Sequence, residues 1–135
     1  MSVRTTPCPK PVRSGRLRKA GQFLDAATDV LALADDQDDI GDAYVTLCVH
    51  AGIAAADVLC CAGLGTYASG QDHNEAIAML KQLDGTAAGH LNTLLNLKTK
   101  AGYTSNAVSA AEVKRAERAA TDLVKRARAA HAAAG

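Results

Sequence analysis

Aromatic residues are scarce in this sequence, which has no Trp, one Phe and three Tyr among its 135 residues. Proteins that bind single strands of nucleic acid stack successive bases on several aromatic side chains, so a surface of that kind is poorly supplied here. The chain contains 29 Ala instead, and Ala favours helices and lets their backbones approach closely. The composition therefore predicts one all-helical domain.

Proline is confined to positions 7, 9 and 11, where it is interleaved with basic residues. Because Pro disrupts helices and this segment has almost nothing apolar to bury, residues 1–13 are predicted to form a disordered basic arm. No apolar segment follows these charges, so we expect no signal peptide. The apolar middle of the chain is interrupted by His50, Gly52 and Asp57, so we expect no membrane span and a cytoplasmic location.

The four cysteines, Cys8, Cys48, Cys60 and Cys61, have neither a C-x-x-C spacing nor a paired spacing that suits a metal. The last three lie in the apolar middle of the chain, so free thiols in a reducing compartment are predicted. Carboxylate metal sites in helical bundles use a Glu-x-x-His pattern with further inward Glu residues, and the sequence has no such pattern. We therefore expect no metal site and no cofactor.

Basic residues are missing from the middle of the chain. Residues 20–80 contain ten acidic residues and no Lys or Arg, whereas residues 1–19 contain six basic residues and no acidic one. Residues 81–135 contain nine basic and four acidic residues, and the formal net charge is +1. Two interpretations remain open: the acidic middle pairs with the basic ends, within one chain or across a dimer, or the charges lie on separate solvated helix faces.

Capping signals mark the starts and ends of the predicted helices. Ser14 is a suitable first cap, and Gly63 and Gly65 are expected to stop the second helix. Asp72 with Glu75, and Ser109 with Glu112, each have the spacing of a capping box. These signals, together with apolar residues at helical spacing, divide the chain into segments that can each bury one face.

The predicted fold is all-α: an antiparallel four-helix bundle with an additional short helix. The bundle is expected to span residues 14–130, and residues 131–135 to form a frayed tail. The second helix has the most apolar residues and is expected to be the central one. The predicted helices cover residues 14–34, 39–62, 72–84, 86–101 and 109–130, and Asp42 is an alternative start for the second of them.

Two polar residues interrupt the apolar second helix. His50 and Asp57 are seven positions apart, so they lie on nearly the same face of that helix, about two turns from each other. They could form a polar pair in a groove of the bundle and act as low-specificity catalytic candidates. Alternatively, Asp57 pairs with a base of the last helix. A further histidine, His90, opens the fourth helix, but a lone His on a helix is not specific for phosphotransfer.

The last helix is expected to bury one apolar stripe and to carry basic residues along another side. Such a row can contact phosphates or an acidic partner, and it is equally typical of an ordinary solvated face. The residues concerned are Lys114, Arg118, Lys125 and Arg128.

The order of these segments resembles the HEPN domains, a family of helical bundles. The resemblance is carried by DAYVTLCVHAGIAAADVLCCAGLG, then DHNEAIAMLKQL, HLNTLLNLKTKAGY and SAAEVKRAERAATDLV, and covers about residues 14–128. It implies a helical bundle that commonly forms a homodimer. It further implies a link to metal-independent RNA cleavage and to toxin–antitoxin or defence systems that include a nucleotidyltransferase.

Active members of that family carry an Arg, then four to six residues, then a His, often with a Tyr two positions later. On this chain Tyr103 matches the Tyr, but Ala101 stands at the His position and Asn96 at the Arg position. Without the His, no side chain at this position can transfer the proton, and without the Arg none can bind the phosphate through two hydrogen bonds. Lys98 and Lys100 could still contact phosphate.

A literal Arg-x4-His string, RARAAH, runs from Arg126 to His131 in the alanine-rich tail. It is a second low-specificity catalytic candidate. The segment LNLKTKAGYTS is predicted to end the fourth helix, with Gly102 in a left-handed cap and Tyr103 as a structural anchor against the bundle.

The function predicted from the sequence is a non-catalytic, HEPN-like module for binding or assembly. Two alternatives remain: a metal-independent ribonuclease toxin, and a protein that binds nucleic acid or nucleotides through its basic final helix. The expected partners are a second copy of the chain, a nucleotidyltransferase-type protein, and RNA or a nucleotide. No membrane association is expected.

Overall fold

The computed structural model describes residues 4–70 and 73–135, and within them five α-helices pack with one short two-stranded antiparallel β-sheet. We call this sheet the hairpin, although α1 and α2 separate its two strands in the sequence. The predicted all-helical bundle is therefore confirmed in outline, and the hairpin is an addition to it. In chain order the elements are β1 (Thr5–Pro7), α1 (Lys10–Leu33), the 3-10 helix η1 (Gln37–Ile40), α2 (Gly41–Leu64), β2 (Thr66–Ala68), α3 (His73–Leu83), α4 (Gly85–Tyr103) and α5 (Ala110–Ala134).

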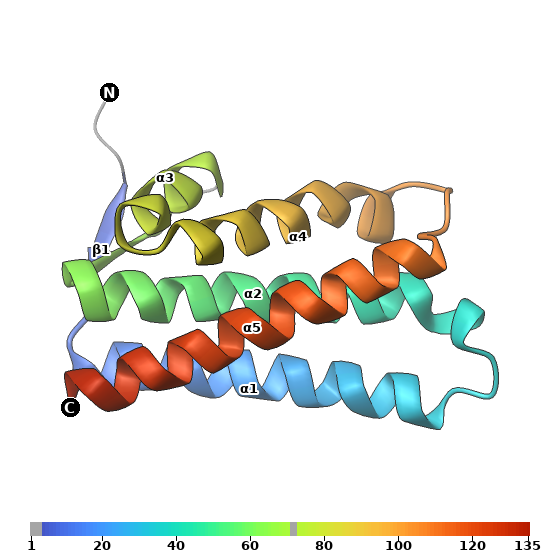
Figure 1. Cartoon of the computed structure of the whole chain (residues 1–135), viewed down its shortest axis with the longest axis horizontal. Helices are drawn as coiled ribbons and strands as arrows, with labels where there is room; N and C mark the ends of the chain where they lie inside the picture. Colours follow the sequence, from blue (N-terminus) through green and yellow to red (C-terminus); the bar gives the residue numbers. More distant parts are fainter. Residues whose placement is uncertain (1–3, 71–72) are drawn as a thin grey trace.

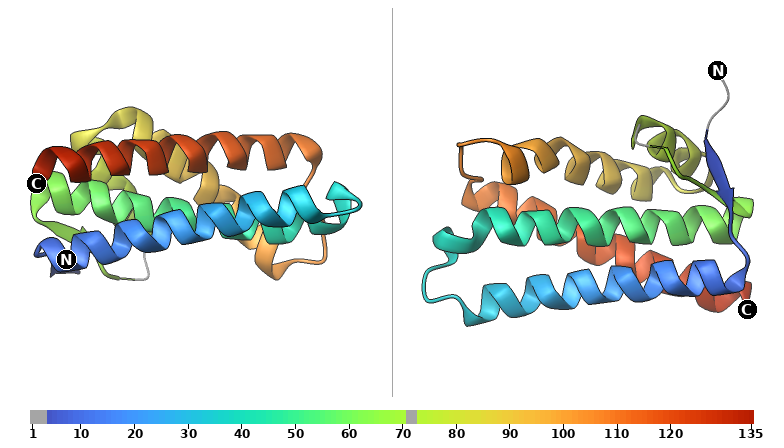
Figure 2. Two further views of the ribbon diagram at one scale, coloured as in Figure 1. Left: turned by 90° about the horizontal axis from the view of Figure 1, so that it is seen from below. Right: turned by 180° about the vertical axis from the view of Figure 1, so that it is seen from behind.

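Helix α2 lies at the centre of the bundle, with α1 on one side, α4 on the other and α5 crossing over it (Figure 1). The view from behind shows the same order with α5 on the far side (Figure 2). The hairpin, α3, the start of α1 and the end of α5 all lie at one end of the molecule. The connections α1–α2 and α4–α5 lie at the opposite end.

The core confirms the prediction that α2 is the most buried helix. Its small residues Ala51, Ala54 and Ala55 are fully buried, which lets the neighbouring helices approach closely. At Gly52 the approach is closest, because an added Cβ would collide with the side chain of Leu94 from α4.

Two of the predicted helix ends are confirmed. Gly65 ends α2 with φ of 77°, and its N–H donates to the carbonyl of Cys61 at 3.0 Å. Glycine suits this position because other residues rarely adopt a left-handed backbone. At the start of α5, Glu112 N–H donates to Ser109 Oγ at 3.1 Å, and Ser109 N–H donates back to Glu112 Oε1 at 2.9 Å. The Asp72 cap falls outside the described residues.

The N-terminal segment differs from the predicted disordered arm. Residues Thr5–Pro7 pair antiparallel with Thr66–Ala68, and α1 begins at Lys10, four residues before the predicted cap at Ser14. Pro11 is compatible with this helix because it lies in the first turn, where backbone N–H groups have no partner within the helix. Proline in this segment therefore marks a helix start.

The C-terminal tail also differs from the prediction, because α5 continues to Ala134. Its last turns are held to α1 by a hydrogen bond between Arg13 and His131. The end of α4 differs too. Gly102 is helical, since positive φ among the glycines of the described residues occurs only at Gly65 and Gly135, and Tyr103 is 77% exposed. Tyr103 does not anchor the bundle.

A disulfide joins Cys8 to Cys61, whose Cα atoms are 5.6 Å apart. The prediction of free thiols is wrong for Cys61, which pairs with Cys8, and correct for Cys48 and Cys60, which are free and buried. The pairing depends on tertiary structure: the hairpin places Cys8 beside the end of α2, and the spacing of the two residues along the chain gives no sign of it.

The stretch Gln37–Leu64 is long and apolar enough to span a membrane by length and composition alone. In this fold its most apolar window is 72% buried. The core helix of a bundle can be as apolar as a membrane-spanning helix. Burial in the core is therefore a sufficient reason for the apolar composition of this stretch.

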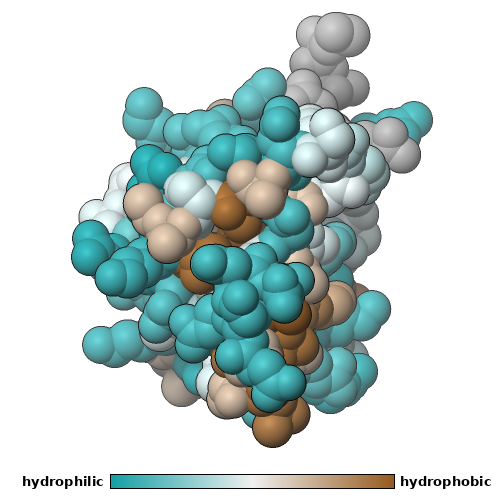
Figure 3. Space-filling model, turned by 90° about the vertical axis from the view of Figure 1, so that its right-hand side faces the viewer, coloured by the Kyte–Doolittle hydropathy of each residue, from teal (hydrophilic) through white to brown (hydrophobic). Residues whose placement is uncertain are grey.

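The surface at the end of the molecule opposite β1 and β2 combines polar and hydrophobic residues. The end that holds the α1–α2 and α4–α5 connections is largely hydrophilic, with hydrophobic residues at the centre and toward the lower right of that face (Figure 3). The acidic turn between α1 and η1 lies there, and Leu33 at the end of α1 is 83% exposed. Of the ion pairs within the described residues, one joins the acidic middle to a basic end, Arg16 with Asp57.

Candidate ligand-binding groove

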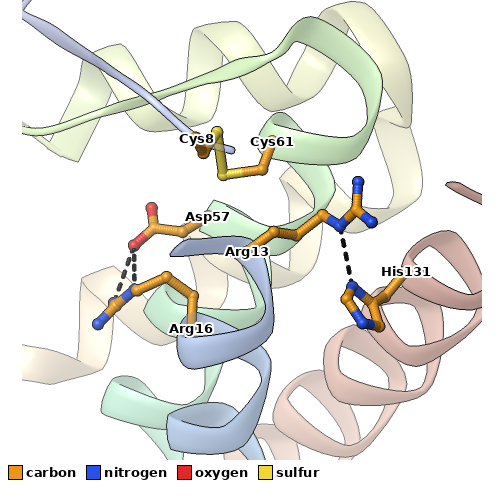
Figure 4. The surroundings of a disulfide bond; sticks show 6 residues. All are labelled: Cys8, Arg13, Arg16, Asp57, Cys61 and His131. Atoms are coloured by element: carbon orange, nitrogen blue, oxygen red, sulfur yellow. Dashed lines mark hydrogen bonds and ion pairs between the residues drawn. A yellow bond between two sulfur atoms is a disulfide. The ribbon is translucent and has the colours of Figure 1, made fainter. Parts of the chain in front are cut away.

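Arg126 and His131, the ends of the Arg-x4-His string, are held by different partners. The Arg126 guanidinium donates to Asp122 at 2.6 Å and to Asp84 at 2.8 Å. His131 accepts at Nδ1 from Arg13 at 2.9 Å (Figure 4). Five positions along an α-helix turn a side chain by roughly 140°, so the two candidates face different neighbours and do not form one site.

Arg126 belongs to a charged network that the sequence analysis did not identify. Nε2 of His90 lies 3.0 Å from the Asp122 carboxylate. Asp84 also accepts the Ala87 N–H at 3.0 Å and caps α4, and this bond lowers the pKa of Asp84. The hydrogen bond from Arg126 lowers the pKa of Asp122. The network fastens the start of α4 to α5 and explains both His90 and Arg126 as structural residues.

Asp57 pairs with a base of the first helix, so the interpretation that it pairs with a base of the last helix is wrong. Arg16 donates to Asp57 Oδ2 from Nε at 2.9 Å and from Nη2 at 2.8 Å (Figure 4). Burial raises the pKa of Asp57 to about 6, against the opposing effect of Arg16. His50 is exposed, and its ring packs 5.3 Å from that of Phe23. His50 and Asp57 line different cavities, so they do not form the polar pair that was considered.

The two lysines near the end of α4 are not equivalent. Lys100 donates to Glu112 at 2.7 Å, and this hydrogen bond is the main reason that the pKa of Glu112 falls to about 2. Lys100 therefore serves to hold the start of α5. Nζ of Lys98 lies 3.2 Å from Nε2 of His73, and Lys98 borders two adjacent hollows in the surface.

All four residues of the predicted basic row on α5 are exposed. Lys114, Arg118 and Lys125 line a shallow depression together with the acidic residues Glu117 and Asp122. The alternation of charges makes this face less positive than the row of bases alone suggested. Arg128 is exposed but does not line the depression.

A polar groove of about 400 Å³ lies between α3 and α4, and we call it the α3/α4 groove. Helix α4 contributes Asn92, Asn96, Thr99 and Tyr103, whose spacings of four, three and four place them on one face. The complete lining is His73, Asn74, Ile77, Asn92, Leu95, Asn96, Lys98, Thr99 and Tyr103.

A smaller hollow of about 150 Å³ adjoins the α3/α4 groove at its Tyr103 end. It is lined by His50 of α2, and Lys98 and Tyr103 belong to both spaces. Three residues for which the sequence predicted three different roles therefore line the same hollow. The structure brings together His50, a catalytic candidate, Lys98, a phosphate candidate, and Tyr103, a supposed anchor.

The groove offers neutral hydrogen-bonding groups, one cation and one exposed ring. Side-chain amides donate and accept at once, and an exposed tyrosine ring can stack on a planar ligand. No group of three or more His, Cys, Asp or Glu residues suited to a metal occurs within the described part of the chain. Helical spacing along α4 could have indicated the stripe of Asn92, Asn96, Thr99 and Tyr103, but the contribution of α3 could not be inferred.

Comparison with protein-family models, with curated protein sequences and with solved structures found no match for this chain. The resemblance to HEPN domains therefore depends on the order and motifs of the sequence alone.

Proposed function

We propose that this chain is a non-catalytic binding module that takes a nucleotide, or one nucleotide of a single-stranded RNA, in the α3/α4 groove. The observation that carries the proposal is the position of Tyr103, which is 77% exposed and borders the groove beside Lys98. An exposed ring and a cation supply the two contacts that one nucleotide needs: a surface for stacking the base and a charge for the phosphate.

The arrangement of the catalytic candidates supports binding without cleavage. Arg126, His131 and Asp57 each have a partner of their own, and no hydrogen bond or ion pair within the described residues joins two of the candidates. A general base must be held within hydrogen-bonding distance of the proton it removes, and an acid must be placed on the leaving group. The basic row on α5 remains the alternative binding surface.

Replacing Tyr103 with Ala is expected to weaken the binding of a labelled oligouridylate or of a mononucleotide about tenfold, since stacking contributes roughly 1 to 3 kcal/mol per base. Tyr103→Phe keeps the ring and should bind like the wild type. Fluorescence anisotropy of the oligonucleotide measures both. A triple variant, Lys114→Ala with Arg118→Ala and Lys125→Ala, should bind normally; if it alone loses affinity, the α5 row is the binding surface.

Salt dependence separates the two surfaces independently of any variant. The logarithm of the binding constant falls against the logarithm of salt concentration with a slope of roughly −0.7 per phosphate contact for single strands. A groove with Lys98 as its one cation should therefore give a slope of about −0.7, and the three bases of the α5 row about −2.

The wild-type protein is expected to leave RNA intact in the presence of EDTA, because no described pair of candidate residues can share a proton transfer. Gel analysis of a labelled RNA after prolonged incubation measures this. Cleavage that disappears in His131→Ala would restore the ribonuclease interpretation through the tail, and cleavage that disappears in His50→Ala would place it in the smaller hollow. Lys19→Ala, an exposed change on α1, is the matched control.

The remaining expectations follow from the HEPN resemblance and belong to the same proposal. They are a homodimer, a nucleotidyltransferase-type partner and a role in toxin–antitoxin or defence systems. Leu33, exposed beside the acidic turn, is a candidate contact for a second copy. The proposed cytoplasmic location has a condition attached: stable disulfides are typical of oxidising compartments, so in the cytoplasm the Cys8–Cys61 bond must be exchangeable.

A further inference from the structure

The Cys8–Cys61 disulfide holds the N-terminal strand against the end of α2 (Figure 4). Apart from this bond, β1 is fixed by a ladder of three residue pairs, flanked by the Cys8 N–H to Gly65 carbonyl bond at 3.1 Å and the Ser69 N–H to Arg4 carbonyl bond at 3.0 Å. Two-stranded hairpins are marginally stable by themselves in water. The covalent bond is therefore the principal attachment of β1.

The two sulfur atoms differ in their surroundings. Cys61 is 4% exposed, whereas Cys8 is only half-buried and lies two residues before the start of α1. Residues 4–19 contain basic residues and no acidic one, and a helix N-terminus favours negative charge. Both effects attract an approaching anion, such as the thiolate of a small thiol, to the more accessible Cys8 sulfur. Cys60, the neighbouring free thiol, is buried, and burial raises its pKa to about 12. Cys60 therefore stays protonated and does not attack the disulfide in place of a small thiol.

We propose that Cys8 is a site of thiol–disulfide exchange with small thiols, and that exchange there releases β1 from the bundle. In the first step the thiolate of the small thiol attacks the Cys8 sulfur, the Cys8–Cys61 bond breaks, and Cys61 leaves as a thiolate that takes a proton from water. In the second step another small thiol attacks the added sulfur and frees Cys8. The protein disulfide is reduced to two thiols, and two small thiols are oxidised to one disulfide.

Release of β1 uncovers a small cavity between α2, α3 and α4. Ala68 of β2 and Gly70 line a cavity of about 80 Å³, together with Asp57 and other residues of α2, α3 and α4. Arg4 lies across this cover, since a Cβ added at Gly70 would be 3.5 Å from Cβ of Arg4. When β1 detaches, β2 loses its ladder partner and the cover loses Arg4. The exchange therefore controls access to the cavity beside Asp57.

The test uses the oxidised full-length protein and glutathione as the small thiol. After brief exposure, free thiols are trapped with a maleimide and the glutathione adduct is located by peptide mass spectrometry. The adduct is expected on Cys8 at least ten times more often than on Cys61, without denaturant. An adduct found mainly on Cys61, or a bond that glutathione leaves intact until the protein is unfolded, would overturn the proposal.

Amide hydrogen exchange tests the release itself. In the reduced protein the Ser69 amide should exchange at least ten times faster than in the oxidised protein, while the Val113 amide in α5 should not change. Cys61→Ala should show the fast rate with or without thiol. The adjacent change Cys60→Ala keeps the disulfide and should respond to thiol like the wild type. Equal Ser69 rates in oxidised and reduced wild-type protein would show that the hairpin holds without the bond.

Discussion

Replacing Arg16 with Ala is expected to lower the free energy of unfolding by about 2 to 3 kcal/mol at pH 7.5, because it leaves a buried carboxylate without its cation. The side chain of Asp57 is 10% exposed and that of Arg16 is 26% exposed. Solvent therefore screens the pair in part, and the expected loss lies below that of a fully buried pair. Urea denaturation followed by circular dichroism measures the change.

The loss in Arg16→Ala should become smaller when the pH is lowered from 7.5 to 5. The native pKa of Asp57 is about 6, against an ordinary value of 3.8. A carboxyl whose pKa is raised by folding binds its proton more tightly in the folded state, so its contribution to stability increases as the pH falls between these values. Removing Arg16 removes a group that lowers this pKa, which raises it further. Protonation then relieves the unpaired charge.

Arg18→Ala is the matched control, since Arg18 is an exposed base on the same helix and its removal should change stability by less than about 0.5 kcal/mol. Adding Asp57→Asn to Arg16→Ala should recover stability at pH 7.5 because it removes the charge. If the loss in Arg16→Ala is the same at both pH values, the aliphatic part of Arg16 matters and the ion pair does not.

Gly52→Ala is expected to destabilise the fold by about 1 to 3 kcal/mol, since it overfills a packed contact. The added methyl group would collide with the Leu94 side chain and would lie 3.3 Å from Cδ1 of Leu123. Helices α4 and α5 both contribute to this contact, so neither can move away without disturbing the core. Thermal unfolding measures the loss.

The same substitution at Gly89 is expected to have the opposite sign. Gly89 is exposed on α4, and nothing lies within 4 Å of an added Cβ. Gly89→Ala should therefore stabilise the protein by about 0.5 to 1 kcal/mol through the lower entropy of the unfolded chain. A loss of stability in Gly89→Ala as large as that in Gly52→Ala would show that close packing is not the cause.

The regular parts of this fold were predictable because they depend on residues close together in the sequence. The capping box at Ser109 and the left-handed end at Gly65 are local, and both were found. The buried stripe of α5 follows helical spacing and was also found. The ordered structure of the N-terminal segment was not predicted, because it depends on contacts with β2 and Cys61, more than fifty residues away along the chain.

The candidate site was predicted less well for the same reason. Lys98 was identified as a cation and Tyr103 as notable, but the role given to Tyr103 assumed that a helix ended before it. Asp57 was recognised as needing a partner, and the partner proved to be Arg16, 41 residues earlier. A sequence pattern indicates that a buried charged side chain such as Asp57 needs a partner. Which residue is the partner depends on how α1 packs against α2.

The disulfide also determines how the chain can be handled from its ends. Residues 8–61 form a covalent ring that contains α1 and all but the last three residues of α2, the central helix of the fold. Machinery that threads a polypeptide through a narrow pore can unfold and pull through α5, α4 and α3. At Cys61 it reaches the ring, where two segments of the chain would have to enter the pore side by side. The oxidised chain therefore resists complete processive unfolding from the C-terminus, and the reduced chain does not.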